Sequence, residues 1–365
     1  MTTKNPNYGT IAPMLKSLEA LVRCESPTED LAACNEVIQL ASDISKTVIG
    51  DSGRVLQIEG RPVFWLGDEN PDVVLLAHLD TVWPKGSFEP VWEVSGDVIR
   101  GPGVFDMKAG FIQALYALID LEGSVALIAT SDEETGSEAS RELIKKVSQS
   151  AKAVLVLEAS VDGKVKTGRK GTAMYRINLH GRAAHAGLEP EKGINATVEI
   201  SRIILSLTSL ENPKFGTTVV PTVLRSGNTT NTVPDHAILD IDARSYSQEE
   251  LVRVDAQIRE FAAQHPEASV IIEGGLNRPP LEPDSTEDIY KKAVKVATRL
   301  GMSLDHAQVG GASDGNFAAA AGAKVLDGLG AVGAGAHSKN EWASVSALTE
   351  RSNFLHHLVK ELLND

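Results

Sequence analysis

The chain has 365 residues, and its 49 acidic residues outnumber its 35 basic residues to give a formal net charge of -14. A chain of this size suits about two domains, on the usual prior of about 150 residues per domain. The acidic balance argues against nucleic acid or an anionic membrane as the main partner and favours a small-molecule or peptide substrate.

The cysteine content and the hydropathy indicate a cytoplasmic protein. Cys24 and Cys34 are the two cysteines, too few for a disulfide framework, so we expect free thiols in a reducing compartment. Residues 1–9 are polar and lack the apolar core of a signal peptide. No stretch approaches the roughly 18 apolar residues that a membrane span requires.

The first candidate site follows a buried strand. Residues 10–23 and the segment after them have the spacing of covering helices, and the apolar run 73–77 then predicts a strand that ends in His78 and Asp80. Catalytic groups in α/β sheets lie at this end of the strands. Asp80 can hold one imidazole nitrogen so that the other binds a metal, and we therefore count it among the catalytic residues, although an ordinary polar loop is favoured for such a pair taken alone.

An aspartate opens the next helical pattern. From Asp106 the apolar spacing is helical through Leu121, which predicts that Asp106 lies near a helix N-terminus, where the helix dipole favours its ionised form. A plain N-cap is the alternative, and for this residue alone it has the better odds.

Two further apolar strands end in carboxylates. The strand predicted at 125–130 leads into Glu133 and Glu134, and the strand at 153–157 is followed by Glu158. Adjacent glutamates suit a metal site in which one carboxylate binds and its neighbour acts as a base, although a solvated loop or a helix start would also place them here. Three strands that each end in a possible ligand are hard to ascribe to coincidence.

The periodicity changes near residue 170 and predicts a second domain. Strand-like and helical spacing follow one another over 175–180, 194–210, 217–225, 236–244, 247–263 and 268–273. This βαββαβ order is typical of a ferredoxin-like α+β sandwich, whose free sheet edges are ready dimer contacts. We therefore expect a catalytic domain at 1–171 and 281–365, a mixed and mostly parallel sheet with helices on both faces, and an inserted lid and dimerisation domain at 172–280.

The C-terminal part contains a glycine-rich loop. Gly328, Gly330 and Gly333 match the spacing of a dinucleotide-binding fingerprint, but no helix is predicted after them to receive a pyrophosphate. A flexible loop that brings His337 into position is the better interpretation. Helices are expected at 286–300, 317–321 and 343–363, and a short strand is expected at 323–326.

Five side chains from these segments form a candidate ligand set. They are His78, Asp106, Glu134, Glu158 and His337. Two histidines with three carboxylates suit two divalent ions, zinc first, with cobalt or manganese as alternatives. A carboxylate shared between the ions would hold them about 3.5 to 4 Å apart, and Asp106 is our choice for it.

The motifs around these residues resemble one family of enzymes. The segments 78–82, 101–108, 131–137, 157–158 and 335–337 resemble the di-zinc metallopeptidases that include aminoacylase, acetylornithine deacetylase and succinyl-diaminopimelate desuccinylase. The runs 166–171 and 181–187 look most like the glutamate carboxypeptidase (carboxypeptidase G) branch.

The resemblance implies a zinc-exopeptidase fold and a role for each ligand. Glu133 would be the general base, Asp106 would bridge, and the peptide bond between Asp106 and Met107 would be cis. His78 and Glu158 would hold one metal, with Glu134 and His337 on the other.

The resemblance also implies substrate contacts in the inserted domain. His185 would donate to the oxyanion and reach the site of a neighbouring subunit in a homodimer, and Asn231 would contact substrate. Arg244 would bind the α-carboxylate through paired hydrogen bonds, unless it forms a salt bridge with Asp240 or Asp242.

Two further substrate contacts are expected, and both are weaker candidates. Backbone N–H groups of the loop around Gly311 can bind an anion, and Arg278 is a candidate for a side-chain carboxylate.

The function expected from these residues is metal-dependent hydrolysis of an amide bond that releases a C-terminal amino acid, with glutamate or aspartate as the sharper expectation. An N-acyl-amino-acid deacylase or a dipeptidase on the same scaffold is the main alternative. A noncatalytic binding relative is disfavoured, because the ligand set and Glu133 are all present.

Overall fold

The computed structural model describes residues 10–364, so the polar stretch 1–9 lies outside the described residues. The chain divides into two compact units, the first comprising the chain up to Gly168, Pro283–Val309 and the residues from Ser313 onward. The second unit comprises Arg169–Glu282 and Gly310–Ala312. The boundaries expected at 172 and 280 differ slightly from the 169 and 282 observed, and no sequence pattern predicted that Gly310–Ala312 belongs with the second unit.

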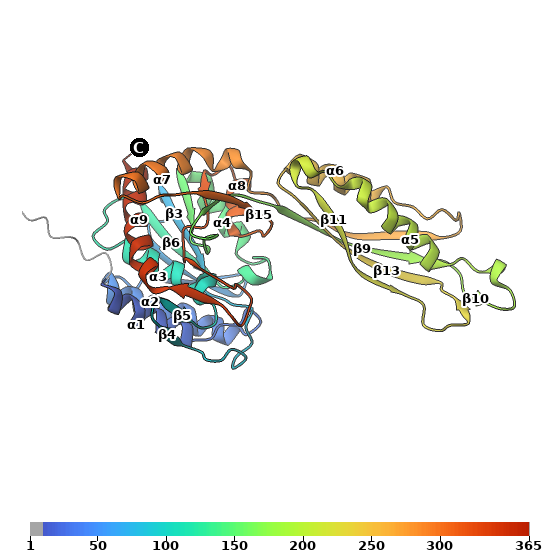
Figure 1. Ribbon diagram of the computed structural model, residues 1–365, viewed down its shortest axis with the longest axis horizontal. Coiled ribbons are helices and arrows are strands. Elements are labelled where there is room, and N and C mark those ends of the chain that lie inside the picture. The colour runs from blue at the N-terminus through green and yellow to red at the C-terminus, as the bar shows by residue number, and fades with distance from the viewer. Residues whose placement is uncertain (1–9, 365) are drawn as a thin grey trace, which may run out of the picture. The chain divides into compact units, whose positions relative to one another are not determined.

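The first unit is built on a mixed, mostly parallel sheet (Figure 1). In spatial order its strands are β1 (Arg54–Ile58), β2 (Arg61–Gly67), β6 (Val125–Thr130), β3 (Val73–His78), β7 (Ala153–Val156) and β16 (Val325–Leu326). The last four run parallel, and β1 and β2 are antiparallel additions at one edge. The predicted sheet class is confirmed, although the β1–β2 hairpin was not predicted.

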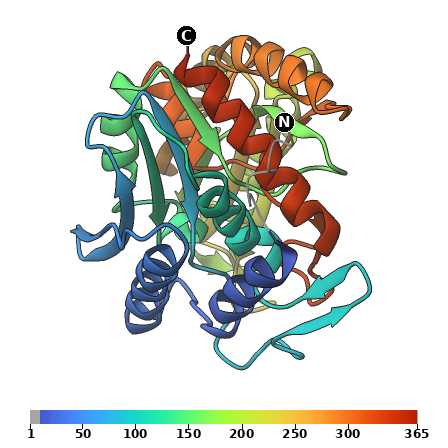
Figure 2. The ribbon, with the colours of Figure 1, turned by 90° about the vertical axis from the view of Figure 1, so that its left-hand side faces the viewer.

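Helices cover both faces of this sheet (Figure 2). They are α1 (Ile11–Arg23), α2 (Leu31–Val48), α3 (Ala109–Ala117), α4 (Arg141–Ser150), α7 (Glu287–Arg299), α8 (Asp314–Ala320) and α9 (Val345–Leu363). Val73, Leu75 and Ala77 of β3 share one core with side chains of α1, α2, α3, α7 and α9. On the opposite face α8 packs on β7 and α4 packs on α8. Every residue of the central strand β3 is therefore buried, which explains its unbroken apolar run.

The segment that carries Asp106 differs from the prediction. Asp106 and Met107 have non-helical backbone angles, and α3 begins only at Ala109 and ends at Ala117, before the predicted end at Leu121. Asp106 is not an N-cap, because no side chain caps the start of α3. Its backbone N–H donates to a buried carboxylate, that of Glu341.

A small antiparallel sheet lies beside this segment. Its strands, in spatial order, are β17 (Gly333–Ala334), β18 (Trp342–Ser344), β5 (Val98–Arg100) and β4 (Glu93–Ser95). The glycine-rich stretch from Gly328 leads into β17 and not into a helix, so the dinucleotide interpretation fails as expected. Two further strands of the first unit, β8 (Val165–Arg169) and β15 (His306–Val309), pair with each other.

The second unit is the predicted ferredoxin-like sandwich. Its antiparallel sheet has the order β11 (Thr218–Ser226), β13 (His236–Ser245), β9 (Gly171–His180) and β14 (Ser269–Arg278), with helices α5 (Ala196–Leu207) and α6 (Gln248–Arg259). Tyr175, Ile177 and Leu179 of β9 pack with the helices in one core, and the alternate residues Met174 and Arg176 are exposed on the other face.

Short elements complete the two units. A two-stranded pair joins β10 (Ala184–His185) to β12 (Thr232–Val233), and single helical turns lie at Glu133–Thr135, Pro190–Lys192, Thr208–Leu210, Pro213–Phe215 and Pro283–Ser285. None of the helices within residues 10–364 is both long and apolar enough to cross a membrane.

Candidate metal centre

Three neighbouring parallel strands deliver the first ligands to one edge of the sheet. His78 is the last residue of β3, Glu133 and Glu134 lie in the turn after β6, and Glu158 follows β7. The register pairs β3 directly with both β6 and β7, so the segments that follow the three strands emerge together. This is the strand edge at which α/β sheets bind ligands.

Asp106 lies between the two histidines. Its Oδ1 is 3.4 Å from His78 Nε2, and its Oδ2 is 3.5 Å from His337 Nε2. Oδ1 is buried and accepts no hydrogen bond from any residue in the described range 10–364. The peptide bond between Asp106 and Met107 is cis, as the resemblance implied. A carboxylate that offers one oxygen to each side is the arrangement required of a ligand shared by two ions.

The remaining ligands gather on either side of Asp106. His337 Nε2 is 3.0 Å from Glu134 Oε2, and His78 Nε2 is 3.8 Å from Glu158 Oε1. Ligand atoms of Asp106, Glu134 and His337 lie within 4.8 Å of one another, and those of His78, Glu133 and Glu158 form a second such group. The structure thus brings together all five predicted ligands, with Glu133 among them.

The electrostatics of this cluster fit bound cations. Burial disfavours a charged His78, but the Asp106 and Asp80 carboxylates close to its ring raise its pKa well above the ordinary value. Hydrogen bonds with Asp106 and Glu134 raise the pKa of His337 to about 10. Both shifts report the negative field of closely spaced carboxylates. The imidazole and carboxylate donors, together with the unbonded Asp106 oxygen, fit two borderline divalent ions.

Asp80 contacts both His78 and the turn that carries Glu133 and Glu134. It is fully buried, and its carboxylate accepts hydrogen bonds from the Thr28 hydroxyl at 2.8 Å and from the N–H groups of Glu133 and Glu134 at 3.3 and 3.1 Å. His78 Nδ1 lies 3.5 Å from Asp80 Oδ1 and 3.1 Å from its backbone oxygen. Asp80 therefore orients His78 and also the Glu133 turn, and it is a positioning residue, although we expected it among the catalytic residues.

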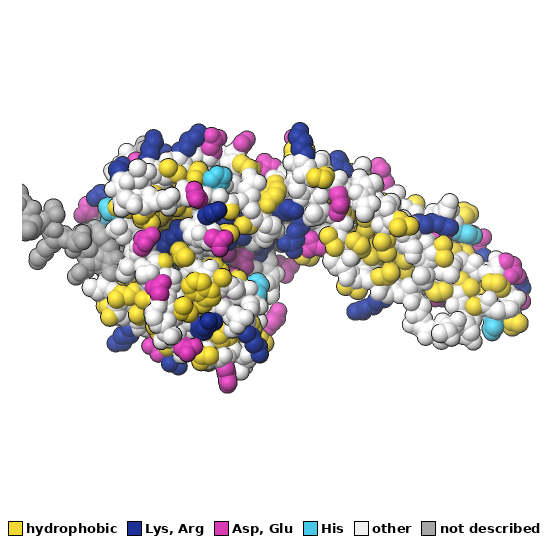
Figure 3. Space-filling model, in the orientation of Figure 1, with side chains coloured by type: hydrophobic (Ala, Val, Ile, Leu, Met, Phe, Trp, Pro, Cys, Tyr) yellow, Lys and Arg dark blue, Asp and Glu magenta, His cyan; other side chains and the backbone are white. Residues whose placement is uncertain are grey.

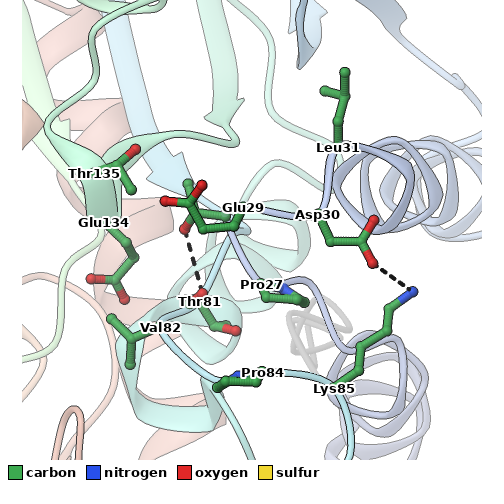
Figure 4. A pocket seen from close by; sticks show the side chains of 11 residues that line it. Pro27, Glu29, Asp30, Leu31, Thr81, Val82, Pro84, Lys85, Glu134 and Thr135 are labelled. Atoms are coloured by element: carbon green, nitrogen blue, oxygen red, sulfur yellow. Dashed lines mark hydrogen bonds and ion pairs between the residues drawn. The ribbon is translucent and has the colours of Figure 1, made fainter.

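A cavity opens beside Glu134 (Figure 4). Its volume is about 650 Å³, and its lining is formed largely by residues that follow α1 and β3. Leu31 and Val82, which both line it, are 46% and 40% exposed. Lys85 also lines the cavity, but its ammonium lies 3.5 Å from Asp30 Oδ2 and 3.8 Å from Glu36 Oε2, so its charge is already countered. The cavity thus combines exposed aliphatic surface with a ligand of the metal centre.

In the second unit the structure brings His185 and Asn231 together. His185 lies on β10 opposite Thr232, and the N–H of Ala186 donates to the backbone oxygen of Asn231 at 2.8 Å. His185 Nδ1 accepts hydrogen bonds from two backbone N–H groups, at 3.1 and 3.2 Å. A neutral His185 ring therefore carries its proton on Nε2, and the exposed side chain can donate it to a ligand.

Arg244 forms the salt bridge considered as its alternative. Its Nε and Nη2 donate to the two carboxylate oxygens of Asp242 at 2.8 and 3.0 Å, and its Nη1 donates to the backbone oxygen of Gly310 at 3.1 Å. Arg169 likewise holds the backbone oxygen of Gly311 at 3.1 Å. Two arginines thus anchor the loop 310–312 by its carbonyl groups. Sequence patterns did not single out Arg169.

The structure gives less support to Arg278 as a substrate contact and to Asp240 as the partner of Arg244. Arg278 is only 7% exposed, which leaves it little surface with which to meet a substrate. Asp240 accepts both hydrogen bonds of Arg176, at 2.7 and 2.9 Å, and is not the partner of Arg244.

Further residues beside the centre were missed from the sequence. Glu341 is buried and accepts hydrogen bonds from the segment that carries Asp106, and Lys166 Nζ lies 3.9 Å from Glu158 Oε2. Neither residue stands at the end of an apolar strand, and the resemblance assigned no role to either one.

The chain is similar to known proteins in sequence and in fold. Residues 74–361 match peptidase family M20/M25/M40. The chain is 31% identical to carboxypeptidase G2 of Pseudomonas sp. (strain RS-16), over 96% of this chain and 89% of that protein. It is 24% identical to succinyl-diaminopimelate desuccinylase of Marinobacter nauticus, over 97% and 100%. A dinuclear metal binding peptidase of the M20 family from Bacillus subtilis has the same fold, with a TM-score of 0.69, 16% identity and coverage of 97% and 98%.

Proposed function

The chain belongs to peptidase family M20/M25/M40, and from this premise we propose that it is a di-metal carboxypeptidase that hydrolyses an amide bond and releases a C-terminal amino acid. The observation that supports the proposal most is the convergence of five ligands around Asp106, with Glu133 beside them. The likeness to carboxypeptidase G2 supports the carboxypeptidase specificity over the other hydrolases of the family.

The proposed ligands divide into two sets that share Asp106. His78 and Glu158 would hold one ion, and Glu134 and His337 would hold the other, with zinc as the first choice and cobalt or manganese as alternatives. When bound, these ions supply Lewis-acid polarisation of the scissile carbonyl and a lower pKa for the attacking water.

The chain's own residues move the protons. Glu133 takes a proton from the attacking water, whose oxygen bonds to the acyl carbon, and passes this proton to the nitrogen of the leaving amino acid as the C–N bond breaks. Asp80 keeps His78 Nε2 turned toward Asp106 throughout. The Nε2–H of His185 donates to the carbonyl oxygen as it gains negative charge.

Recognition of the two halves of the substrate divides between two groups of residues. Three of the five N–H groups of Arg244 are used in the folded chain, and the remaining two bind the α-carboxylate of the released amino acid, with backbone N–H groups around Gly311 beside them. Asn231 lies at the other end of β13, next to the strand of His185, and contacts the substrate together with His185. The acyl half lies in the cavity beside Glu134, against Leu31 and Val82.

A turnover screen tests this function. The purified protein is incubated with N-acyl amino acids after addition of zinc, cobalt or manganese, and release of the free amino acid is measured. We expect metal-dependent release, with highest kcat/KM for C-terminal glutamate or aspartate, and no release by Glu133→Gln. Absence of turnover with every metal would reject the carboxypeptidase.

A deacylase that releases a short acyl group is the second candidate. The full-length likeness to a desuccinylase supports it, and the same scaffold would serve a dipeptidase. Including N-succinyl amino acids and free dipeptides in the screen distinguishes these activities. Turnover of any amide would exclude a noncatalytic binding protein.

A homodimer through the second unit is part of the proposal. Strand β11 is an edge strand on which Val220 and Leu224 are 47% and 49% exposed, and Leu205 on α5 is 78% exposed. Figure 3 shows apolar side chains on the surface of this unit. Exposed apolar side chains next to an unpaired strand edge suit a second copy of the same chain. Because both cysteines are free thiols, we place this dimer in the cytoplasm.

Mixed dimers test whether His185 acts across the interface. His185→Ala and Glu133→Gln each lose activity as pure proteins, by about 10²-fold or more. If His185 serves the partner's site, subunit exchange between the two variants creates one site with both residues intact, and activity returns. Activity that stays at the level of the separate variants, with exchange demonstrated by mass, would assign His185 to its own chain.

A further inference from the structure

Glu341 lies where the two ligand-bearing loops meet. It follows the loop that contains His337 and directly precedes β18. Strand β18 pairs antiparallel with β5, with Trp342 opposite Arg100, so Glu341 faces the beginning of the segment 101–108 that carries Asp106. The side chain of Glu341 is therefore in reach of backbone groups that are far away in the sequence.

The carboxylate of Glu341 accepts four hydrogen bonds. Its Oε1 accepts from the backbone N–H groups of Phe105 at 2.9 Å and Asp106 at 3.1 Å. Its Oε2 accepts from the N–H of Gly103 at 3.2 Å and from the indole N–H of Trp83 at 3.2 Å. Glu341 is 1% exposed, so these donors take the place of water. Successive backbone N–H groups that converge on one anion form a concave anion site.

The backbone of this segment is shaped for the contact. Gly103 has a φ of 71°, in the left-handed region, and a Cβ there would lie 2.5 Å from Thr81 Cγ2. The N–H of Asp106 belongs to the residue whose two carboxylate oxygens face His78 and His337. Glu341 thus fixes the backbone of the shared ligand directly, without an intervening residue.

A carboxylate is the side chain that this position requires. Glutamine has the same shape but one acceptor oxygen in place of two, so two of the four donors would face an NH₂ group. Burying a charge is unfavourable, and none of the four donors is a cation, although the buried Lys108 interacts with Glu341 through its charge. Glu341 is buried in spite of this unfavourable free energy, and it contacts the segment that carries Asp106. This position favours a role at the candidate metal centre over a role in general stability.

We propose that Glu341 is a positioning residue for the metal centre, whose carboxylate ties the segment of Asp106 to the loop of His337 before any ion binds. This inference rests on the proposed metal centre. Because both ion sites share Asp106, loss of the Glu341 hydrogen bonds weakens metal binding at both sites. Loss of His78 or His337 weakens metal binding at one site.

The test measures metal binding and not only turnover. Glu341→Gln is titrated with zinc against a competing chelator, at a temperature at which circular dichroism shows the variant folded. We expect zinc affinity to fall about 10- to 100-fold, as is usual when a residue that orients a metal ligand is changed. The visible absorption spectrum of the cobalt-loaded variant should also differ from that of the wild type.

Two matched variants separate positioning from general stability. Asp97→Asn removes a neighbouring carboxylate that accepts from the Ser344 hydroxyl and the Ser346 N–H, both at 2.7 Å, but touches nothing in 103–106. It should leave the zinc affinity unchanged even if it lowers the melting temperature. Trp83→Phe removes only the indole donor and should weaken zinc binding less than Glu341→Gln does.

The outcomes separate this inference from the proposed function. If folded Glu341→Gln binds two zinc ions as tightly as the wild type, the positioning role is wrong and the centre stands. If the wild type binds none of zinc, cobalt and manganese, the centre itself is wrong. If Glu341→Gln does not fold, amide exchange in the metal-free wild type decides: protection of the N–H groups of Gly103, Phe105 and Asp106 supports the role, and exchange at the rate of an exposed loop overturns it.

Discussion

The candidate residues of the two units are held in different ways. In the first unit they are mostly buried, and single carboxylates such as Asp80 and Glu341 each hold several neighbours in place. In the second unit His185 is exposed on a strand pair two residues long, Asn231 is exposed directly before that pair, and Arg244 is held by one aspartate and one carbonyl. Under the proposed function, the chemistry is assigned to residues with many fixed contacts in the first unit, and recognition is assigned to residues with fewer contacts in the second.

This contrast predicts where each substitution acts. Changes in the first unit should lower kcat and metal binding, because they disturb groups with fixed geometry. Changes in the second unit should act on KM or on substrate preference while the metal content stays constant, with His185 as the exception because it acts on the reacting oxygen.

Removing the metals should give the largest effect. Chelation is expected to abolish turnover, and zinc should restore it. Ions present at about 1,000 times their Kd stabilise the fold that binds them by about 4 kcal/mol, so the melting temperature of the first unit should fall and that of the second should not. Calorimetry with and without chelator measures this. Equal shifts in the melting temperatures of the two units would contradict the assignment of both metal sites to the first unit.

Replacing the general base Glu133 should give the second-largest effect on activity. Glu133→Gln is expected to lower kcat by about 10²-fold or more with both ions retained. Because Glu133 is also close enough to His78 and Glu158 to be a ligand, the metal content of this variant decides between the two roles. Loss of one ion would make Glu133 a ligand, and full activity would remove it from the mechanism.

A pair of arginines tests recognition in the second unit. Arg244→Met should raise KM about 10- to 100-fold with little change in kcat, since hydrogen bonds to a charged group contribute about 1.5 to 3 kcal/mol. Arg176→Met is the control, because Arg176 makes the same paired contact with Asp240 on the exposed face of the same sheet. Equal effects of the two variants on KM would remove Arg244 from the substrate site.

The smallest effect concerns a thiol of the first unit. Burial, with a further contribution from Asp80, raises the pKa of Cys34 to about 11. The folded chain therefore keeps this proton as the pH rises past the ordinary thiol pKa near 8.5, and it loses stability between that pH and about 11. At pH 8, an alkylating reagent should not modify Cys34 until denaturant is added. Rapid modification of the native protein would show that this part of the first unit opens.

The sequence predicted the elements whose signal is local. Apolar runs ending at His78, Thr130 and Leu157 predicted three adjacent strands and the ligands that follow them, because a buried parallel strand must be apolar on both faces. The order of strands and helices in the second unit was equally visible from its periodicity.

What it did not predict depends on contacts between distant residues. Glu341 and Asp106 are 235 positions apart, and nothing in either segment shows that one accepts a hydrogen bond from the other. The helix expected from Asp106 begins only at Ala109, because the backbone of Asp106 and Met107 is not helical, and the sequence did not indicate this. The partner of Arg244 could only be narrowed to two aspartates, since residues 240 and 242 lie on the same face of one strand.

The central claim is that His78, Asp106, Glu134, Glu158 and His337 hold two ions that share Asp106. The most direct test is anomalous diffraction at the zinc edge from crystals of the zinc-loaded protein. The account predicts two peaks about 3.5 to 4 Å apart, on either side of the Asp106 carboxylate. A single peak, or peaks away from His78 and His337, would contradict it.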